Sequence, residues 1–350
     1  MMEPSIANHR PLISFVDPCC AGGYDAPDLR KGGLGGTEAT VLRVATALRG
    51  QFDINIHQND RAGTSGSEAG TLMPLKVAFR KSQAAAIIVI NRWKVALKLR
   101  KLNSDTPIFV WLHVYPGRHN RKMGAALKDA NITVICVSES HAKAFEEFLG
   151  SEDIPDVTTI YNPIADDLHP DDTRRDPNRL LFASSPHKGL AEVFNQFSLL
   201  RATLPDLTLA VADPGYLNWD TGPVPNGVVF LGSLSHSALI RQMRRSLCLF
   251  YPQTSFAETF GLVLAEANAV GTPALVHSDL GANDEILTGA DQKIDGHSPA
   301  QILARIRLWQ RSPPRLGANP AFRMSKVAAT WTNLITRAVD PRAQTQKSVA

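Results

Sequence analysis

Short apolar runs alternate along the chain with longer segments in which apolar residues recur at helical spacing. Five runs in the first half are expected to be strands: Leu12–Val16, Asp53–His57, Ala86–Ile90, Ile108–Leu112 and Thr133–Val137. A helix is expected at Thr37–Leu48. This alternation is typical of βαβ units with a parallel sheet. Since the runs are too apolar for half-exposed strands, helices should cover both faces of the sheet.

A polar stretch, residues 166–178, interrupts this pattern and is typical of an interdomain linker. Beyond it the alternation restarts. The expected strands are Leu180–Ala183, Thr208–Ala212, Val228–Leu231, Cys248–Tyr251 and Ala274–His277, and the expected helices are Gly189–Ala202, Ser237–Arg245 and Gly261–Val270. We therefore predict two doubly wound α/β domains, residues 1–165 and 179–320, which face each other across a ligand-binding cleft. The polar tail, residues 341–350, is expected to fray.

Length and composition are those of two ordinary globular domains. The chain has 350 residues, of which 44% are hydrophobic and 20% charged. Its net charge of +4 favours anionic partners without distinguishing among them. Of the four cysteines, Cys19 and Cys20 are neighbours, which rarely form a disulfide, and there is no C-x-x-C pair. Reduced, buried thiols are expected, and with no signal peptide or membrane-spanning run in the sequence we predict a cytoplasmic protein.

Two glutamates lie in the most informative segment, residues 255–267. The segment follows an expected strand, and its second half should be a helix that ends before Gly271, with Thr259 as the N-cap. Glu258 and Glu266 are eight residues apart in the sequence, so on one helix they would not share a face. If Glu258 lies in the loop and Glu266 in the helix, both carboxylates can reach one cleft.

The first amides of this helix, those of Phe260 to Val263, provide a site for an anion. A helix N-terminus carries partial positive charge and binds phosphate without a metal. Glu266 has apolar neighbours, so its carboxylate should be largely covered and should need a partner. Both observations favour a functional site over a capped surface helix with scattered glutamates. An anion held between two acceptor carboxylates predicts a ligand with a diphosphate and sugars on either side, such as a nucleotide sugar.

The segment resembles the E-x7-E motif of glycosyltransferase family 4, whose members are retaining enzymes of the GT-B fold, with two Rossmann-like domains facing across a cleft. The resemblance implies that Glu258 contacts the transferred sugar and that Glu266 binds the ribose hydroxyls. It also implies that the backbone amides of Phe260, Gly261 and Leu262 meet the donor phosphates. No metal ligand is implied.

The resemblance extends over nearly the whole chain. Gly271-Thr272-Pro273-Ala274 and Glu285 lie where the family has its G-x-P-V and E-I segments. The strand that ends at Gly232 resembles the one beside the nucleotide base, and Asn162-Pro163-Ile164 resembles the turn that enters the linker. The resemblance further implies that the last helix, within residues 321–340, crosses back to brace the first domain.

A glycine-rich loop, residues 32–36, lies between an expected strand and helix. It is not a dinucleotide fingerprint, because Glu38 occupies the place of the third glycine. Taken alone, such glycines are as well explained by a flexible turn. The loop resembles the family's G-G-x-E segment, which implies that Gly35 and Gly36 approach the diphosphate and sugar of the donor.

Two basic side chains complete the expected site. Lys188 follows the first strand of the second domain, where an ammonium could neutralise charge on a leaving diphosphate, although lysines at such turns are usually solvated. It resembles the lysine of the family's G-R-x4-K-G element, whose arginine would fall at Ala183. Either His187 or another basic residue compensates for this alanine, or the leaving group is less stabilised. His113, at the end of an apolar strand, matches a family histidine near the reacting sugar, while a structural role is the common alternative.

These features predict a retaining, metal-independent glycosyltransferase without a cofactor. It would move a sugar from a UDP- or GDP-linked donor to a hydroxyl of a glycan or lipid-linked glycan, as in polysaccharide biosynthesis. The alternatives are a nucleotide-sugar epimerase of the same fold and a degenerate protein that only binds the donor. A glycosidase is disfavoured, because it gives no reason for a phosphate-binding helix start.

Residues 76–101 carry eight basic and no acidic side chains, with Trp93 and aliphatic residues interleaved. A basic helix with an aromatic residue could rest on an anionic membrane surface, which would make the protein peripheral at the inner face of a membrane. The alternative is a solvated helix with long aliphatic stems. Nucleic acid is not an expected partner, since no recognised motif supports it.

Overall fold

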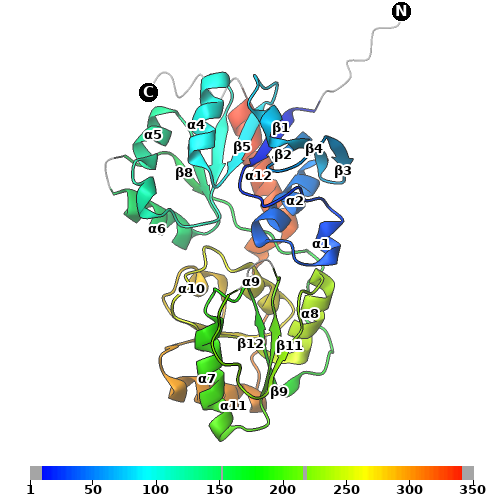
Figure 1. Cartoon of the computed structure of the whole chain (residues 1–350), viewed down its shortest axis with the longest axis vertical. Helices are drawn as coiled ribbons and strands as arrows, with labels where there is room; N and C mark the ends of the chain where they lie inside the picture. Colours follow the sequence, from blue (N-terminus) through cyan, green and yellow to red (C-terminus); the bar gives the residue numbers. More distant parts are fainter. Residues whose placement is uncertain (1–9, 151–152, 216–218, 341–350) are drawn as a thin grey trace, which may run out of the picture.

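The computed structural model describes residues 10–150, 153–215 and 219–340, which form two α/β domains, one above the other in Figure 1. The first domain has an eight-stranded sheet in the order β3-β4-β2-β1-β5-β6-β7-β8, parallel except for the pair β3–β4. Its strands are β1 Leu12–Asp17, β2 Asp53–Gln58, β3 Ser65–Ser67, β4 Gly70–Pro74, β5 Ala86–Ile90, β6 Ile108–Trp111, β7 Thr133–Cys136 and β8 Val157–Thr159.

Helices cover both faces of this sheet, as the apolar strands require. They are α1 Asp28–Lys31, α2 Gly36–Leu48, α3 Leu75–Ala78, α4 Trp93–Leu102, α5 Met123–Asp129 and α6 Glu139–Leu149, with a 3-10 turn η1 at Arg118–Asn120. Successive strand residues point to opposite faces. In β1, Phe15 therefore packs into the core beneath α2, whereas Val16 packs into the core shared with α4, α5 and α6.

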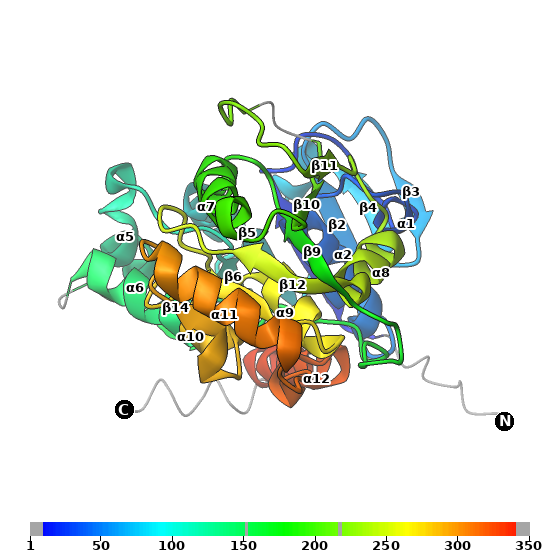
Figure 2. The ribbon, with the colours of Figure 1, turned by 90° about the horizontal axis from the view of Figure 1, so that it is seen from below.

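The second domain has a six-stranded parallel sheet in the order β11-β10-β9-β12-β13-β14. Its strands are β9 Asp176–Ala183, β10 Thr208–Ala212, β11 Val228–Phe230, β12 Ser246–Tyr251, β13 Ala274–His277 and β14 Lys293–Ile294. Its helices are α7 Leu190–Thr203, α8 His236–Arg245, α9 Leu262–Ala269, α10 Asn283–Ile286 and α11 Pro299–Arg311, with 3-10 turns η2 Ala290–Gln292 and η3 Pro320–Phe322. Seen from below, α7 and α8 lie on either side of the central strands (Figure 2).

The last helix, α12 (Met324–Val339), returns to the first domain and packs against α2 and β5. Trp331 is fully buried there, with its ring centroid 4.7 Å from that of Trp111 and 6.3 Å from that of Phe15. A backbone bridge between Ile164 and Arg323 joins the two crossings of the chain between the domains. The final helix thus supplies part of the core of the first domain.

The fold class expected from the sequence is confirmed, with one local correction. The expected linker, residues 166–178, overlaps the beginning of β9, which pairs from Asp176. The basic side chains of residues 76–101 are divided by the expected strand, β5: three lie on α3 and in the loop 79–85, and five lie on α4 or at its N-cap, so α4 alone is the basic helix. The tail, residues 341–350, lies outside the described residues.

Replacing Trp331 with alanine is expected to destabilise the first domain by about 3–5 kcal/mol, because a large side chain leaves a cavity between α12 and the sheet. Denaturation followed by tryptophan fluorescence measures this loss. Thr336→Ala, an exposed position on the same helix, is the control and should change the free energy of unfolding by less than about 0.5 kcal/mol. Equal effects of the two substitutions would contradict the bracing role of α12.

Candidate active site

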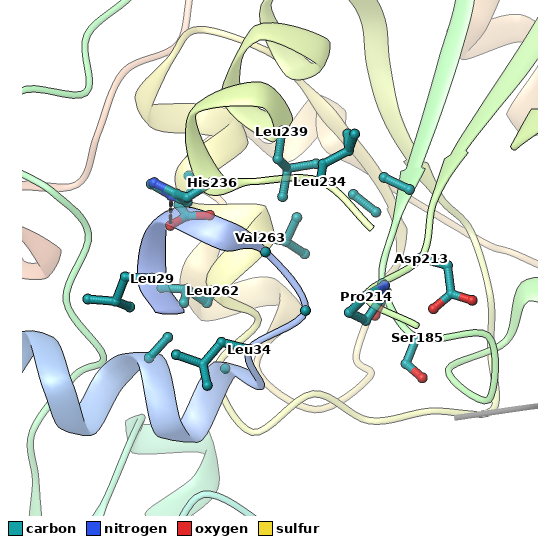
Figure 3. A pocket seen from close by; sticks show the side chains of 18 of the residues that line it. Leu29, Leu34, Ser185, Asp213, Pro214, Leu234, His236, Leu239, Leu262 and Val263 are labelled. Carbon is teal, nitrogen blue, oxygen red and sulfur yellow. Dashed lines mark hydrogen bonds and ion pairs between the residues drawn. The ribbon is translucent and has the colours of Figure 1, made fainter. Parts of the chain in front are cut away.

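The carboxyl ends of the two parallel sheets meet at a cleft lined by both domains. The larger of two adjoining cavities, about 1120 Å³, is lined by the loops that follow β1 and β6 in the first domain and by the loop after β12 in the second. The smaller, about 230 Å³, is lined by residues of α2, α8 and the start of α9 (Figure 3). Glu258, Lys188 and Leu262 line both cavities. This is the position at which ligands bind in open α/β folds.

Glu258 lies in the loop between β12 and α9 and is 8% exposed. Both of its carboxylate oxygens accept hydrogen bonds from the ammonium of Lys188, at 2.9 and 3.0 Å, and one accepts a third from the Tyr251 hydroxyl at 3.1 Å. The Lys188 ammonium also lies 4.7 Å from the ring centroid of Phe256. The structure therefore brings together two of the residues predicted to be catalytic, as one partly buried ion pair at the cleft.

The start of α9 faces the smaller cavity. Gly261 precedes the helix with a φ of +81°, a left-handed conformation that favours glycine. Leu262 and Val263, the first residues of the helix, line the cavity. The first amides of a helix have no hydrogen-bond partner inside the helix, so they are available to a ligand. The Phe260 side chain is buried against Phe322, with ring centroids 5.1 Å apart, so only its main chain is available to a ligand.

Thr259 is not the N-cap of α9, contrary to the expectation from sequence. Its hydroxyl donates a hydrogen bond to the carbonyl oxygen of His113 in the first domain, at 2.9 Å. Ser138 of the first domain in turn donates to the carbonyl oxygen of Thr259. The threonine therefore fixes the loop of Glu258 against the facing domain, and the turn into α9 is made by glycine.

Glu266, inside α9, is 3% exposed and bonded to both domains. Its Oε1 lies 2.8 Å from Nε2 of His236, the first residue of α8 (Figure 3), and 3.4 Å from a guanidinium nitrogen of Arg43 on α2. Burial raises the pKa of the Glu266 carboxyl, but the hydrogen bond and charge of His236, together with the charge of Arg43, outweigh it, and the net shift is downward. The carboxylate is thus held ionised at the base of the cavity.

The glycine loop contacts the second domain through Gly32, while Gly35 and Gly36, expected to approach the donor, lie further along the loop. Gly32 and Gly33 have φ of +91° and +80°. A Cβ on Gly32 would lie 2.5 Å from the carbonyl oxygen of Leu234, so the backbones of the two domains touch at this glycine. Gly35 is the N-cap of α2 and Gly36 its first residue, and both line the larger cavity.

Gly232, expected beside a nucleotide base, has a φ of +65° and lies in the turn between β11 and α8. It is not among the residues that line the two cavities. Leu234, two residues further along, does line the smaller one. The turn that contains Gly232 therefore borders the smaller cavity through Leu234.

His113 lines the larger cavity at the end of β6. Burial, together with the neighbouring His141, lowers the pKa of its imidazole to about 3, so the ring is neutral near pH 7. Its ring centroid lies 4.5 Å from that of Trp111, and its Nε2 has no hydrogen-bond partner among the described residues. A neutral ring cannot supply a positive charge to the cleft.

The position of the missing arginine, Ala183, lines the smaller cavity. His187 does not replace the arginine charge, because burial, followed by the charge of Lys188, lowers its pKa. Its ring instead lies between Phe256 and Trp219, at centroid distances of 5.5 and 5.9 Å. Lys188 and Arg43 are the permanent cations among the described residues that line this cavity, and both are already paired with a glutamate.

Four site residues, Arg43, His236, Tyr115 and Tyr251, were not found from the sequence. Tyr115 donates a hydrogen bond to the carbonyl oxygen of Glu258 from 143 positions away, and Arg43 lies 223 positions from Glu266. No local pattern signals such pairs. A weak signal existed for His236 alone, because it begins a helix directly after the glycine-terminated strand.

Among the described residues, no group of three or more histidine, cysteine, aspartate or glutamate side chains could hold a metal ion. Within the same ranges, no helix has the length and apolar content needed to cross a membrane. The four cysteines are free, and only Cys19 is partly exposed.

Parallel sheets that face each other across a cleft, braced by a last helix that returns to the first domain, define the GT-B class of proteins. Two solved structures share this arrangement over nearly the whole chain. A sucrose-phosphate synthase from Thermosynechococcus elongatus has a TM-score of 0.68 at 15% identity, covering 94% of this chain and 99% of that one. A glycosyltransferase from Rickettsia africae has a TM-score of 0.68 at 12% identity, covering 95% and 100%. The chain has the GT-B fold.

Sequence comparison is consistent with this class. Residues 172–321 match the family model described as "Glycosyl transferases group 1". A phosphatidyl-myo-inositol mannosyltransferase from Propionibacterium freudenreichii is 37% identical over 113 residues, 32% of this chain and 28% of that protein. A glycogen synthase from Mycobacterium tuberculosis is 26% identical over 240 residues, 61% of this chain and 57% of that protein. The match thus spans at most 57% of these relatives' length. The second domain is thus similar to glycosyltransferases of this family, within a chain that has the GT-B fold.

Replacing Glu266 with glutamine is expected to cost about 1–3 kcal/mol of stability near pH 7, because Arg43 and His236 lose their ionised partner. A carboxyl whose pKa is lowered by folding stabilises the protein above its unfolded pKa, about 4.3, and this contribution disappears as the pH falls through the lower folded value. The difference between wild type and variant should therefore shrink below about pH 4. Urea denaturation from pH 7 to pH 3 measures it, with Glu147→Gln, at an exposed position, as the control. A difference independent of pH would contradict the ionised state.

Proposed function

We propose that the protein transfers a sugar from a nucleoside diphosphate sugar to an acceptor hydroxyl. One observation carries the proposal: Glu258 and Glu266 lie on either side of the start of α9 in one cleft between the domains. The helix start is suited to a diphosphate, and the two carboxylates are suited to hydroxyl groups on either side of it. The GT-B fold and the family match of the second domain support the same activity.

The contacts suggest a role for each residue. Glu266 would accept hydrogen bonds from the ribose hydroxyls, with His236 and Arg43 holding its carboxylate in place. The amides at Leu262 and Val263, with the ammonium of Lys188, would stabilise the negative charge that develops on the departing diphosphate. This is the task that a metal performs in other transferases, so we propose a reaction without a metal. The donor base would be uracil or guanine.

Glu258 and His113 would act on the transferred sugar. The Glu258 carboxylate is oriented by Lys188 and Tyr251, so it can hold a sugar hydroxyl in a fixed direction. Neutral His113 lines the opposite side of the cleft and would contact the sugar there. Retention of the anomeric configuration is part of the proposal, and its support is the resemblance of the E-x7-E segment to retaining enzymes.

Nucleoside diphosphate sugars are expected to raise the melting temperature of the wild-type protein, since a ligand at 100 times its Kd stabilises a fold by about 2.7 kcal/mol. Glu266→Ala should abolish this shift, whereas Glu147→Ala, at an exposed position, should retain it. Lys188→Ala should retain binding but slow transfer by about 10²–10³-fold, the usual loss when one stabilising donor is removed. A wild type that no nucleotide sugar stabilises would overturn the proposal.

Two other functions are compatible with the same cleft and are separated by product analysis. An epimerase would convert the donor alone into an isomer, without an acceptor. A protein that only binds its donor is motivated by Ala183, which leaves the diphosphate one cation fewer. Incubation with donor alone, and then with a panel of glycan and lipid-linked acceptors, distinguishes these outcomes from transfer.

We also propose that α4 contacts an anionic membrane surface and so brings the enzyme near a lipid-linked acceptor. Lys94, Lys98 and Lys101 are exposed and lie three or four residues apart, so they share one face of the helix. Trp93 is partly buried and donates a hydrogen bond from its indole nitrogen to Asn120, at 2.9 Å. The contact would thus be electrostatic and would not require insertion of the tryptophan.

Vesicles of phosphatidylglycerol should carry the protein to the top of a flotation gradient at low salt and release it at high salt. Lys94→Ala with Lys98→Ala is expected to weaken this association about 30-fold, from roughly 1 kcal/mol for each lysine near the surface. The absence of flotation at low salt would end this part of the proposal without affecting the donor site.

A further inference from the structure

A second cavity of about 250 Å³ lies in the first domain and shares no lining residue with the cleft. It lies over β1 and β2, on the face of the sheet that α4 covers. The connection from β4 to β5 contains only the one-turn helix α3, followed by the loop 79–85. Because this connection places only one helical turn over the sheet, a hollow remains between the strands and the loop.

The strands place polar side chains under this hollow. Ser14 and Asn55 are register partners on β1 and β2, and His57, two residues further along β2, is the partner of Val16. All four line the cavity. Ser14 is 2% exposed and His57 6% exposed, in a sheet whose other buried strand positions are mostly apolar. Polar groups at such positions cost stability unless they are hydrogen bonded.

His57 carries an unpartnered nitrogen next to this cavity. Its Nδ1 is buried and has no hydrogen-bond partner among the described residues. Burial lowers the pKa of the imidazole to about 4, so the ring is neutral near pH 7. Ser14 and Asn55, which line the same floor, can both donate and accept hydrogen bonds and so suit the hydroxyl groups of a ligand.

The outer wall of the cavity is basic. Arg80 and Lys81, from the loop after α3, line it and are exposed. Neither forms an ion pair with a described residue, and none of the described residues that line the cavity carries a carboxylate. Two free cations above a polar floor suit a molecule with an anionic group at one end and hydroxyl groups at the other.

We propose that this cavity binds a small phosphorylated sugar, with the phosphate on Arg80 and Lys81 and the sugar hydroxyls on Ser14, Asn55 and His57. The site is separate from the cleft, and the proposal does not depend on the transferase activity. Because the sugar enters from the outer face of the first domain, its binding and the binding of a nucleotide in the cleft are compatible.

Calorimetry with glucose 6-phosphate, glucose and inorganic phosphate tests the site, each with and without saturating UDP. Glucose 6-phosphate should bind more tightly than either fragment, and UDP should not displace it. Displacement by UDP would place the ligand in the cleft and overturn the proposal. Equal affinity for inorganic phosphate would reduce the site to an anion contact and also overturn it, as would no binding at all.

Two sets of variants locate the ligand. Arg80→Ala with Lys81→Ala, both on the surface, should weaken glucose 6-phosphate binding about ten-fold or more, through the loss of charge-assisted hydrogen bonds. Lys94→Ala with Lys98→Ala removes the same charge from α4, outside the cavity, and should leave binding unchanged. An equal loss of affinity in the two double variants would show a general effect of charge and would contradict a specific binding site in this cavity.

His57→Phe fills the floor of the cavity with an apolar ring and should abolish the preference for glucose 6-phosphate over phosphate. Its melting temperature shows whether the domain remains folded. Should His57→Phe unfold the domain, Asn55→Leu, at a partly buried neighbouring position, provides the same test. Retained preference in a folded variant would overturn the assignment of the sugar to this floor.

Discussion

The arrangement of the cleft depends on one buried carboxylate that belongs to both domains. Glu266 lies within an apolar helix, yet it is ionised, because His236 approaches it from its own domain and Arg43 from the other. A buried charge is tolerated only when it has partners. Removing one partner from a buried ion pair costs more free energy than the intact pair contributes to stability. The relative position of α2, α8 and α9 is therefore constrained at a single oxygen atom.

Other contacts across the cleft agree with this constraint. Gly32 allows the backbone of the first domain to reach that of Leu234, and Thr259 bonds across to His113. Tyr115 holds the main chain of Glu258 from the opposite side. These contacts involve the same loops that line the cavities. The contacts that hold the two domains together therefore also fix the geometry of the candidate site.

Much of the fold could be predicted from the sequence, because its strands are buried on both faces and therefore form continuous apolar runs. The pair β3–β4 was missed, since Ser65–Ser67 is an exposed edge strand without apolar residues. The E-x7-E segment was found because its two glutamates and the helix start are local in sequence. The cap at Thr259 was wrong, and the pairing of Arg43 with Glu266 was not predicted, because both depend on the second domain meeting the first. Contacts between distant segments leave no periodic signal in the chain.

The return of α12 to the first domain has a consequence for synthesis of the protein. Trp331 completes the core formed by Phe15 and Trp111, although more than 300 residues separate the first and last of these rings in the sequence. During translation the second domain has all of its strands before α12 emerges, whereas the first domain still lacks part of its core. Domains usually fold in order from the N-terminus. Here the first domain to be synthesised is completed only by α12, so the cluster of Phe15 and Trp111 lacks its third ring until that helix has been made.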